Sequence, residues 1–162
     1  MMKKQLEHLL EERRIGTLTT YSEDGMPHVT AVWYLYEEGA LYIATSLTTG
    51  KGRNLQRDPR MALCIESREA GKESGMTAVG HAELITGADA LPLARRINGK
   101  YLTDEALAHP VLGPAFVDMS DLVIRLTPER WISWDMAEMG ELLFAGSDEP
   151  IDEARYFKPI EV

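Results

Sequence analysis

Residues 27–46, PHVTAVWYLYEEGALYIATS, contain two strand-like runs joined by the turn Glu37-Glu38-Gly39. The first run covers about 27–37 and the second covers 40–46, and both are rich in β-branched and aromatic residues. Such residues favour strands. Apolar side chains occur on both faces of the first run, so neither face of this strand is expected to be fully exposed to solvent. Two long strands of this kind, joined as a hairpin, favour a barrel over an open sheet.

Further strand signals lie on both sides of this hairpin. Before it, GTLTTY (16–21) leads into Ser22-Glu23-Asp24-Gly25, whose Asp-Gly pair is typical of a hairpin turn. After it come MALCIES (61–67), TAVGHAELIT (77–86) with Gly80 as an expected bulge or bend, and a strand pair in 121–135 broken at Pro128. We therefore predict a mainly β fold with antiparallel strands.

Helical spacing appears in three other segments, which are residues 2–14, residues 88–101, and a short stretch capped by Thr103 that ends before Pro110. Strands in succession with helices inserted between them predict an antiparallel barrel with helical additions. The length of 162 residues suits one domain, with a core of about 15–135 and a tail of 136–162.

Residues 42–60, YIATSLTTGKGRNLQRDPR, indicate a site for an anion. The strand runs into a Thr- and Gly-rich turn, which can cap a helix and leave backbone N–H groups at the start of that helix. Lys51 falls in the first helical turn, where a cation opposes the helix dipole. A bound anion, most simply a phosphate, would balance that charge. Pro59 predicts that the helix stops at Asp58.

The charge distribution agrees with a small anionic ligand. The chain has a formal charge of −9, whereas Lys51–Arg60 holds four basic residues and one acid. Nucleic acid requires a broad basic surface, so we expect no nucleic-acid partner. The alternative is that these basic residues only form a solvated helix face.

Composition argues for a reducing, non-membrane setting. Cys64 is the single cysteine, so no internal disulfide can form. No apolar run approaches the roughly 20 residues that cross a bilayer, and the N-terminus lacks the apolar core of a signal peptide. We expect a cytoplasmic protein without a membrane partner. The four histidines lack metal-ligand spacing, and we predict no metal site.

Three motifs together resemble the pyridoxamine 5′-phosphate oxidase-like superfamily of flavin-binding split β-barrels. They are D-G-x-P-x-V-x-x-V-W (24–33), L-Y-x-x-T (41–45) and K-x-R-N-L-x-x-D-P-R (51–60). The similarity extends over about Gly16–Leu84, with a weaker match at RWISWD (130–135). It implies a six-stranded antiparallel split β-barrel, a homodimer with cofactor sites at the interface, and FMN as the cofactor.

The resemblance also implies a set of cofactor-binding residues. Backbone groups of Thr30, Ala31, Val32 and Trp33 would line the flavin ring, Thr45 and Ser46 would flank the ribityl-phosphate chain, and Thr49, Gly50 and Lys51 would hold the phosphate with Arg53 and Asn54 nearby. Trp134 or Trp131 would reach the cofactor from the second subunit. No catalytic side chain is identified.

The function implied is hydride transfer between FMN and a small organic substrate. The oxidase proper carries an Arg at the position of Thr30 and an Arg-rich C-terminal motif that this chain lacks, so we do not expect pyridoxine 5′-phosphate oxidation. Two alternatives remain open. A related branch with the same Lys51–Arg60 helix uses a deazaflavin, and some split-barrel proteins bind flavin or haem without catalysis, for which His28 or His81 would be the haem ligand.

Overall fold

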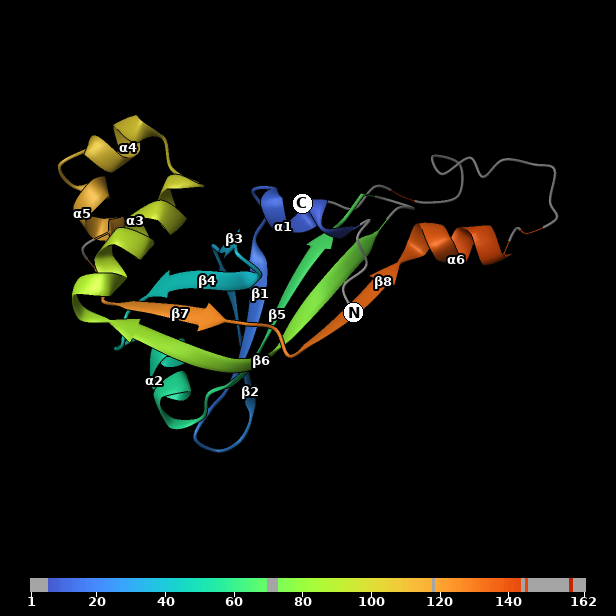
Figure 1. The fold of residues 1–162 in the computed structure, drawn as a ribbon, viewed down its shortest axis with the longest axis horizontal. Coiled ribbons are helices and arrows are strands. Elements are labelled where there is room, and N and C mark those ends of the chain that lie inside the picture. Colours follow the sequence, from blue (N-terminus) through green and yellow to red (C-terminus); the bar gives the residue numbers. More distant parts are fainter. Residues whose placement is uncertain (1–5, 70–72, 118, 144, 146–157, 159–162) are drawn as a thin grey trace.

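The structure, a computed structural model, describes residues 6–69, 73–117, 119–143, 145 and 158 (Figure 1). In these residues the strands follow the order β2-β1-β5-β6-β7-β4-β3, and β8 pairs with β6. Every pairing between these strands is antiparallel. The prediction of a mainly antiparallel β fold with helical additions is therefore confirmed.

The first hairpin forms as the Asp-Gly turn predicts. β1 (Gly16–Tyr21) pairs with β2 (Pro27–Val32) from Gly16 opposite Val32 to Tyr21 opposite Pro27. Gly25 has a φ of +81°, a left-handed conformation that glycine adopts without steric cost. The Ser22 N–H donates to the Met26 carbonyl at 2.9 Å and closes the turn.

The prediction of one continuous strand over 27–37 is wrong. β2 ends at Val32, and a separate short strand, β3 (Leu35–Glu37), pairs with β4 (Ala40–Thr45). Tyr34 lies fully buried at the break and donates its hydroxyl to the Leu9 carbonyl at 2.7 Å. The backbone N–H and carbonyl of Tyr34 contact the Tyr101 hydroxyl in place of a strand neighbour, a long-range contact that strand propensity does not capture.

One strand joins the two halves of the barrel. β6 (Ser74–Thr86) pairs over residues 74–81 with β5 (Arg60–Ser67), over 74–79 with β8 (Arg130–Asp135), and over 82–86 with β7 (Leu122–Leu126). It begins earlier than the predicted residue 77. Gly80 pairs with Met61 two residues before the β7 pairing begins at Ala82, and a Cβ there would lie 3.1 Å from Leu126 Cδ1; a bulge or bend at Gly80 stays a prediction.

The helices occupy the periphery of the barrel (Figure 1). α1 (His8–Glu11) is shorter than the predicted 2–14, because Glu12 turns extended, and residues 1–5 lie outside the described residues. The predicted segment 88–101 contains η2 (Gly87–Asp89) and α3 (Ala90–Gly99), and Thr103 caps α4 (Asp104–Ala108) as predicted. The remaining helices are α2 (Gly50–Arg57), α5 (Leu112–Val117) and α6 (Met136–Leu143).

Two apolar clusters pack the strands and helices against one another. The larger fills the barrel and includes Leu9, Leu18, Leu63 and Ile124. The smaller, Ala90, Ala94, Ile97 and Val123, fixes α3 against the sheet beside β4 and β7. This second contact places the α3–α5 segment over one end of β4, where the pocket described below opens.

Candidate functional site

The end of β4 and the start of α2 form a tight turn built around Thr49. Its hydroxyl accepts from the Gly52 N–H at 3.2 Å and donates to the Ser46 carbonyl at 2.7 Å, so Thr49 is the N-cap of α2. The Thr45 hydroxyl lies 3.1 Å from the Thr49 hydroxyl. A Cβ at Gly52 would collide with the Ser46 carbonyl, so the turn requires glycine at this position. The predicted cap is confirmed.

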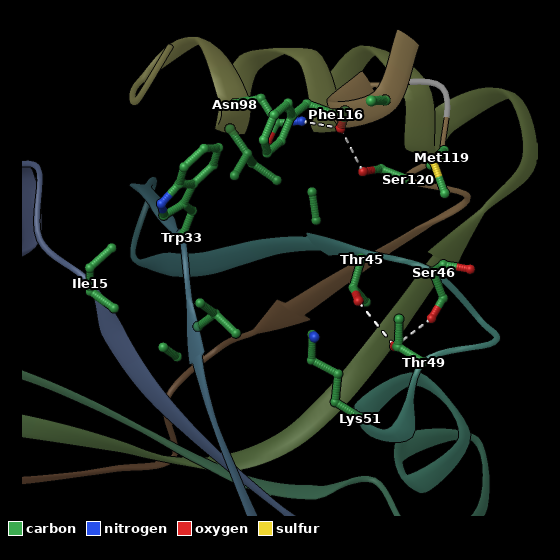
Figure 2. A pocket seen from close by; sticks show the side chains of 15 residues that line it. Ile15, Trp33, Thr45, Ser46, Thr49, Lys51, Asn98, Phe116, Met119 and Ser120 are labelled. Carbon is green, nitrogen blue, oxygen red and sulfur yellow. Dashed lines mark hydrogen bonds between the residues drawn. The ribbon is translucent and has the colours of Figure 1, made fainter. Parts of the chain in front are cut away.

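A cavity of about 400 Å³ opens beside this turn (Figure 2). β2, β4 and the start of α2 form one wall, and α3, α5 and the residues after α5 form the other. The residues that line it are Ile15, Ala31, Val32, Trp33, Ala44, Thr45, Ser46, Thr49, Lys51, Ile97, Asn98, Ala115, Phe116, Met119 and Ser120. Its volume is within the range of small-molecule sites.

Lys51 points its ammonium into this cavity (Figure 2). Within the described ranges its side chain has no hydrogen-bond or ion-pair partner. Partial burial lowers the pKa of the Lys51 ammonium below its ordinary value of 10.5. The chain therefore holds a partly desolvated cation at the start of a helix, where an anionic group would compensate both the charge and the helix dipole.

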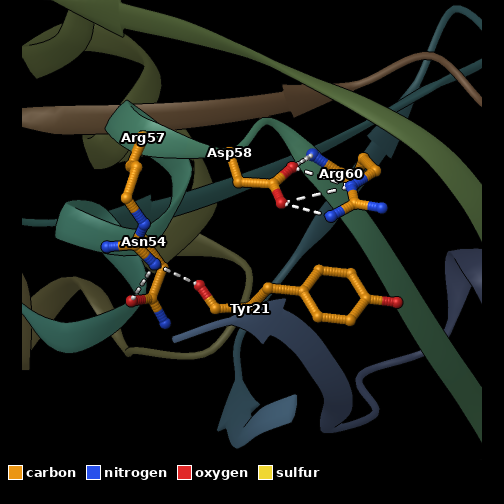
Figure 3. Close-up of polar contacts among 5 residues, drawn as sticks. All are labelled: Tyr21, Asn54, Arg57, Asp58 and Arg60. Carbon is orange, nitrogen blue, oxygen red and sulfur yellow. Dashed lines mark hydrogen bonds and ion pairs between the residues drawn. The ribbon is translucent and has the colours of Figure 1, made fainter. Parts of the chain in front are cut away.

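The other basic residues of the 51–60 segment have protein partners. The Arg53 guanidinium donates to the Thr48 carbonyl, and Arg57 donates to the Tyr21 carbonyl at 2.6 Å. Arg60 pairs with Asp58 at 2.6 Å, and its hydrogen bonds hold the pKa of that carboxyl at about 2 (Figure 3). Of the four basic residues, Lys51 is the one that lines the described pocket.

The structure brings seven of the residues predicted for the cofactor to one cavity: Ala31, Val32, Trp33, Thr45, Ser46, Thr49 and Lys51. The remaining six, Thr30, Gly50, Arg53, Asn54, Trp131 and Trp134, are not among its lining residues. Asn54 lies on the buried side of α2, and its Nδ2 donates to the Thr20 hydroxyl at 3.0 Å. A Cβ at Gly50 would lie 3.1 Å from the His28 ring. The Thr30 hydroxyl is buried and has no hydrogen-bond partner among the described atoms.

The two C-terminal tryptophans lie on β8, outside the pocket of their own chain. Trp131 packs against the barrel core, whereas Trp134 lies over Gly75 and is 39% exposed. Contact with a cofactor held by a second subunit stays a prediction for both residues. Further along the chain, Leu142 on α6 is exposed, and Phe144 lies outside the described residues.

The opposite wall of the pocket was missing from the sequence prediction. It consists of residues from α3 and α5 and from the segment after α5, among them Ile97, Asn98, Phe116 and Ser120. The Trp33 ring stacks on Tyr101, with centroids 4.9 Å apart, and on Phe116 at 5.3 Å. The helical spacing around Ile97 marked an apolar face, but it gave no sign that this face covers β4.

The two histidines considered as haem ligands, His28 and His81, are not among the residues that line this pocket. His28 lies 3.5 Å from the Thr20 hydroxyl, and His81 pairs with Glu129 at 2.6 Å. Across the described ranges, no three His, Cys, Asp or Glu side chains are arranged to hold a metal ion. The helices placed by the structure are all too short or too polar to span a membrane.

Comparison with known proteins gives a family and a fold. The family model described as pyridoxamine 5′-phosphate oxidase matches residues 2–135. The conserved hypothetical protein Rv2991 from Mycobacterium tuberculosis is 28% identical, with a TM-score of 0.69, 86% of this chain covered and 88% of the other. No curated protein matches the chain.

Two further solved structures are less similar in sequence. A protein described as a putative pyridoxamine 5′-phosphate oxidase from Listeria innocua has 21% identity, a TM-score of 0.60, and coverage of 80% and 94%. One described as F420 reductase has 19% identity, a TM-score of 0.63, and coverage of 81% and 98%. At these identities the similarity is one of fold, and it confirms the predicted split-barrel class.

Proposed function

The chain belongs to the pyridoxamine 5′-phosphate oxidase family, and from this premise we propose that it binds FMN and catalyses oxidoreduction of a small organic molecule. The observation that carries the proposal is the partly buried Lys51 ammonium, which lies in the pocket beside the N-cap of α2 and has no partner among the described residues. A desolvated cation costs stability unless an anion joins it, so its position suits a phosphate.

The residues present fit a flavin mononucleotide. Lys51 and the turn around Thr49 would hold the phosphate, Thr45 and Ser46 would accompany the ribityl chain, and the backbone from Ala31 to Trp33 would face the ring. When bound, FMN would supply the hydride-transfer chemistry. The apolar wall from α3 and α5 would keep water from that region. The Trp33 side chain stays in the wall through its stacking on Tyr101 and Phe116.

Binding is tested by titrating the purified protein with FMN and with riboflavin, which lacks the phosphate. We expect FMN to bind and riboflavin to bind at least about tenfold more weakly, because it loses a charge-assisted contact. Equal affinities would remove Lys51 from the phosphate site, and absence of FMN binding would remove the proposal for this cofactor. Mass spectrometry of the ligand that co-purifies provides an independent identification.

Catalysis requires its own experiment. FMN on the loaded protein is photoreduced without oxygen and then exposed to a panel of small organic acceptors. For at least one acceptor we expect reoxidation faster than that of free FMN at the same concentration. Rates equal to free FMN across the panel would favour the non-catalytic alternative, a flavin-binding protein.

A deazaflavin is the second candidate cofactor. The solved structure described as F420 reductase shares the fold over 81% of this chain, and Lys51 with the turn around Thr49 would accept a phosphate from either cofactor. A competition experiment separates the two cofactors. Bound, isotope-labelled FMN is displaced with either a deazaflavin or unlabelled FMN, and displacement by the deazaflavin at the lower concentration would favour the deazaflavin.

We also propose that the protein is a homodimer. Ile132 and Trp134 project from the same face of β8 and are 48% and 39% exposed in the single chain. Adjacent large apolar side chains of this kind mark an interaction surface. Light scattering at micromolar concentration is expected to give the mass of two chains, and a mass of one chain would contradict the shared cofactor site.

A further inference from the structure

The pocket has two ends of different chemistry (Figure 2). One end is polar and is formed by Thr45, Ser46, Thr49 and Lys51 from β4 and α2. The other end, the α5 end, is formed by Ile15, Trp33, Ile97, Ala115, Phe116 and Met119. Phe116 and Met119 remain 39% and 70% exposed, so this end presents apolar surface to whatever enters.

The polar side chains near the α5 end are already bonded to the protein. Asn98 Nδ2 donates to the Phe116 carbonyl at 2.5 Å, and Ser120 Oγ donates to the same oxygen at 2.9 Å (Figure 2). The single hydroxyl proton of Ser120 is therefore used, and Asn98 is only 4% exposed. Neither side chain offers an accessible donor for a phosphate or a carboxylate.

No charged side chain described by the structure balances an anion at this end. Lys51, at the polar end, is the single charged residue among those that line the pocket. On α3, Arg96 pairs with Glu37. Lys100 donates to the Leu10 carbonyl at 3.2 Å and lies 4.3 Å from the Tyr34 ring centroid. An anion at the α5 end would lose hydration without gaining a partner among the described residues of its own chain, which is costly.

We infer that the α5 end of the pocket binds an uncharged, largely apolar molecule, with Phe116 and Met119 determining this specificity. The inference rests on the proposed function in one respect, because it identifies this molecule with the substrate of the FMN-loaded protein. It excludes substrates that carry a phosphate or carboxylate at the end that reaches α5.

Calorimetric titration of the FMN-loaded protein with two matched probes tests the inference. Naphthalene-2-methanol is neutral and 2-naphthoate is anionic, while their rings are the same. We expect the neutral probe to bind at least about tenfold more tightly, because the carboxylate of 2-naphthoate would be buried without a cationic partner. Equal binding, tighter binding of 2-naphthoate, or binding of neither probe would overturn the inference; the last result would mean that FMN or a second subunit fills the α5 end.

Substitution of Met119 gives a sharper test. Met119→Lys introduces a cation at the α5 end and should shift the ratio of affinities toward 2-naphthoate by about tenfold. Met26→Lys is the matched control, since Met26 is 63% exposed in the β1–β2 turn and does not line the pocket. An equal shift in both variants would reflect overall charge and would contradict the assignment of Met119.

The same titrations on FMN-free protein separate this inference from the proposed function. FMN binding is followed independently by flavin fluorescence. If FMN does not bind, the proposed function fails, and the preference between the two probes on FMN-free Lys51→Ala protein, which lacks the single cation of the pocket lining, still decides the nature of the α5 end. If FMN binds and the FMN-loaded protein binds the two probes equally well, the inference fails and the proposed function stands.

Discussion

The Tyr101 hydroxyl is bonded to both backbone polar groups of Tyr34, accepting from its N–H at 3.2 Å and lying 3.0 Å from its carbonyl oxygen. The same hydroxyl lies 2.8 Å from the Arg14 carbonyl, so its one proton serves two acceptors. Tyr34 stands where β2 and β3 separate, and a strand neighbour would ordinarily satisfy these groups. The Tyr101 hydroxyl replaces the missing strand neighbour and so connects the segment after α3 to the barrel.

Tyr101→Phe should lower the free energy of unfolding by about 1–3 kcal/mol, because a part-buried N–H and two carbonyls lose their partner. Urea denaturation measures the change. Tyr36→Phe is the control, since no described residue bonds the Tyr36 hydroxyl. Equal losses in the two variants would show that the Tyr101 bonds contribute nothing specific.

Lys51→Ala should weaken FMN binding about ten- to a hundredfold, the loss expected for a charge-assisted contact of about 1.5–3 kcal/mol. Fluorescence titration measures the affinity. Arg60→Ala removes the same charge from a residue that pairs with Asp58 outside the pocket, and its affinity should stay near that of the wild type. Unchanged binding in Lys51→Ala would place the phosphate elsewhere.

The affinity for FMN should fall as pH rises toward the ordinary lysine pKa of 10.5. Burial lowers the pKa of Lys51 in the free protein, whereas a bound phosphate favours the charged ammonium and raises that pKa. Binding therefore takes up protons once the free protein begins to lose this charge, and the affinity falls above that pH.

Affinities measured across this pH range, with calorimetry in buffers of different ionisation enthalpy, test the proton uptake. Lys51→Arg is the matched control, because a guanidinium keeps its charge throughout the range. If Lys51→Arg showed the same fall in affinity as the wild type, a group other than Lys51 would be responsible.

The lowered pKa of Lys51 also affects the stability of the folded protein. A lysine whose pKa is depressed by folding destabilises the folded protein while it is charged, and this cost disappears as pH rises past the unfolded pKa. Lys51→Met should therefore raise the melting temperature of the FMN-free protein at neutral pH. A lower melting temperature would mean that Lys51 stabilises the free fold through a contact.

Gly52→Ala should destabilise the protein by about 2 kcal/mol or more, because its Cβ would collide with the Ser46 carbonyl and distort the Thr49 turn. Gly99→Ala is the matched control: it lies in α3, the nearest atom would be 3.8 Å from its Cβ, and alanine favours helices. We expect that variant to be stabilised by up to about 1 kcal/mol. Thermal melts of both variants measure the contrast.

Trp134→Glu should shift the proposed homodimer toward the monomer, because it places a charge in the exposed apolar face of β8. Light scattering over a concentration series measures the shift. Leu91→Glu, at an exposed apolar residue on α3, is the control for an added surface charge. A dimer equally stable in all three proteins would exclude this face of β8 from the interface.

Local chemistry predicted several elements correctly. The Asp24-Gly25 turn, the Thr49 cap and the Thr103 cap each depend on a few adjacent residues, and each forms as expected. Pro128 likewise separates β7 from β8. These features are readable because the groups that stabilise them lie within four residues of one another.

Long-range contacts explain what the sequence did not reveal. The break at Trp33–Tyr34 depends on Tyr101, 67 residues further along the chain, and on Leu9. The basic segment was predicted to concentrate charge at the ligand, yet Arg57 is engaged with Tyr21, 36 residues away. Periodicity and composition carry no information about such partners, and the α5 wall of the pocket went unpredicted for the same reason.

The thirteen residues of β6 give the two halves of the barrel a common strand. Opening either half requires breaking a hydrogen-bonded ladder that continues directly into the other, because the β5 pairing ends at His81 and the β7 pairing begins at Ala82. The protein should therefore lose its structure in one cooperative step, and its amide protons nearest Gly80 should exchange with solvent last.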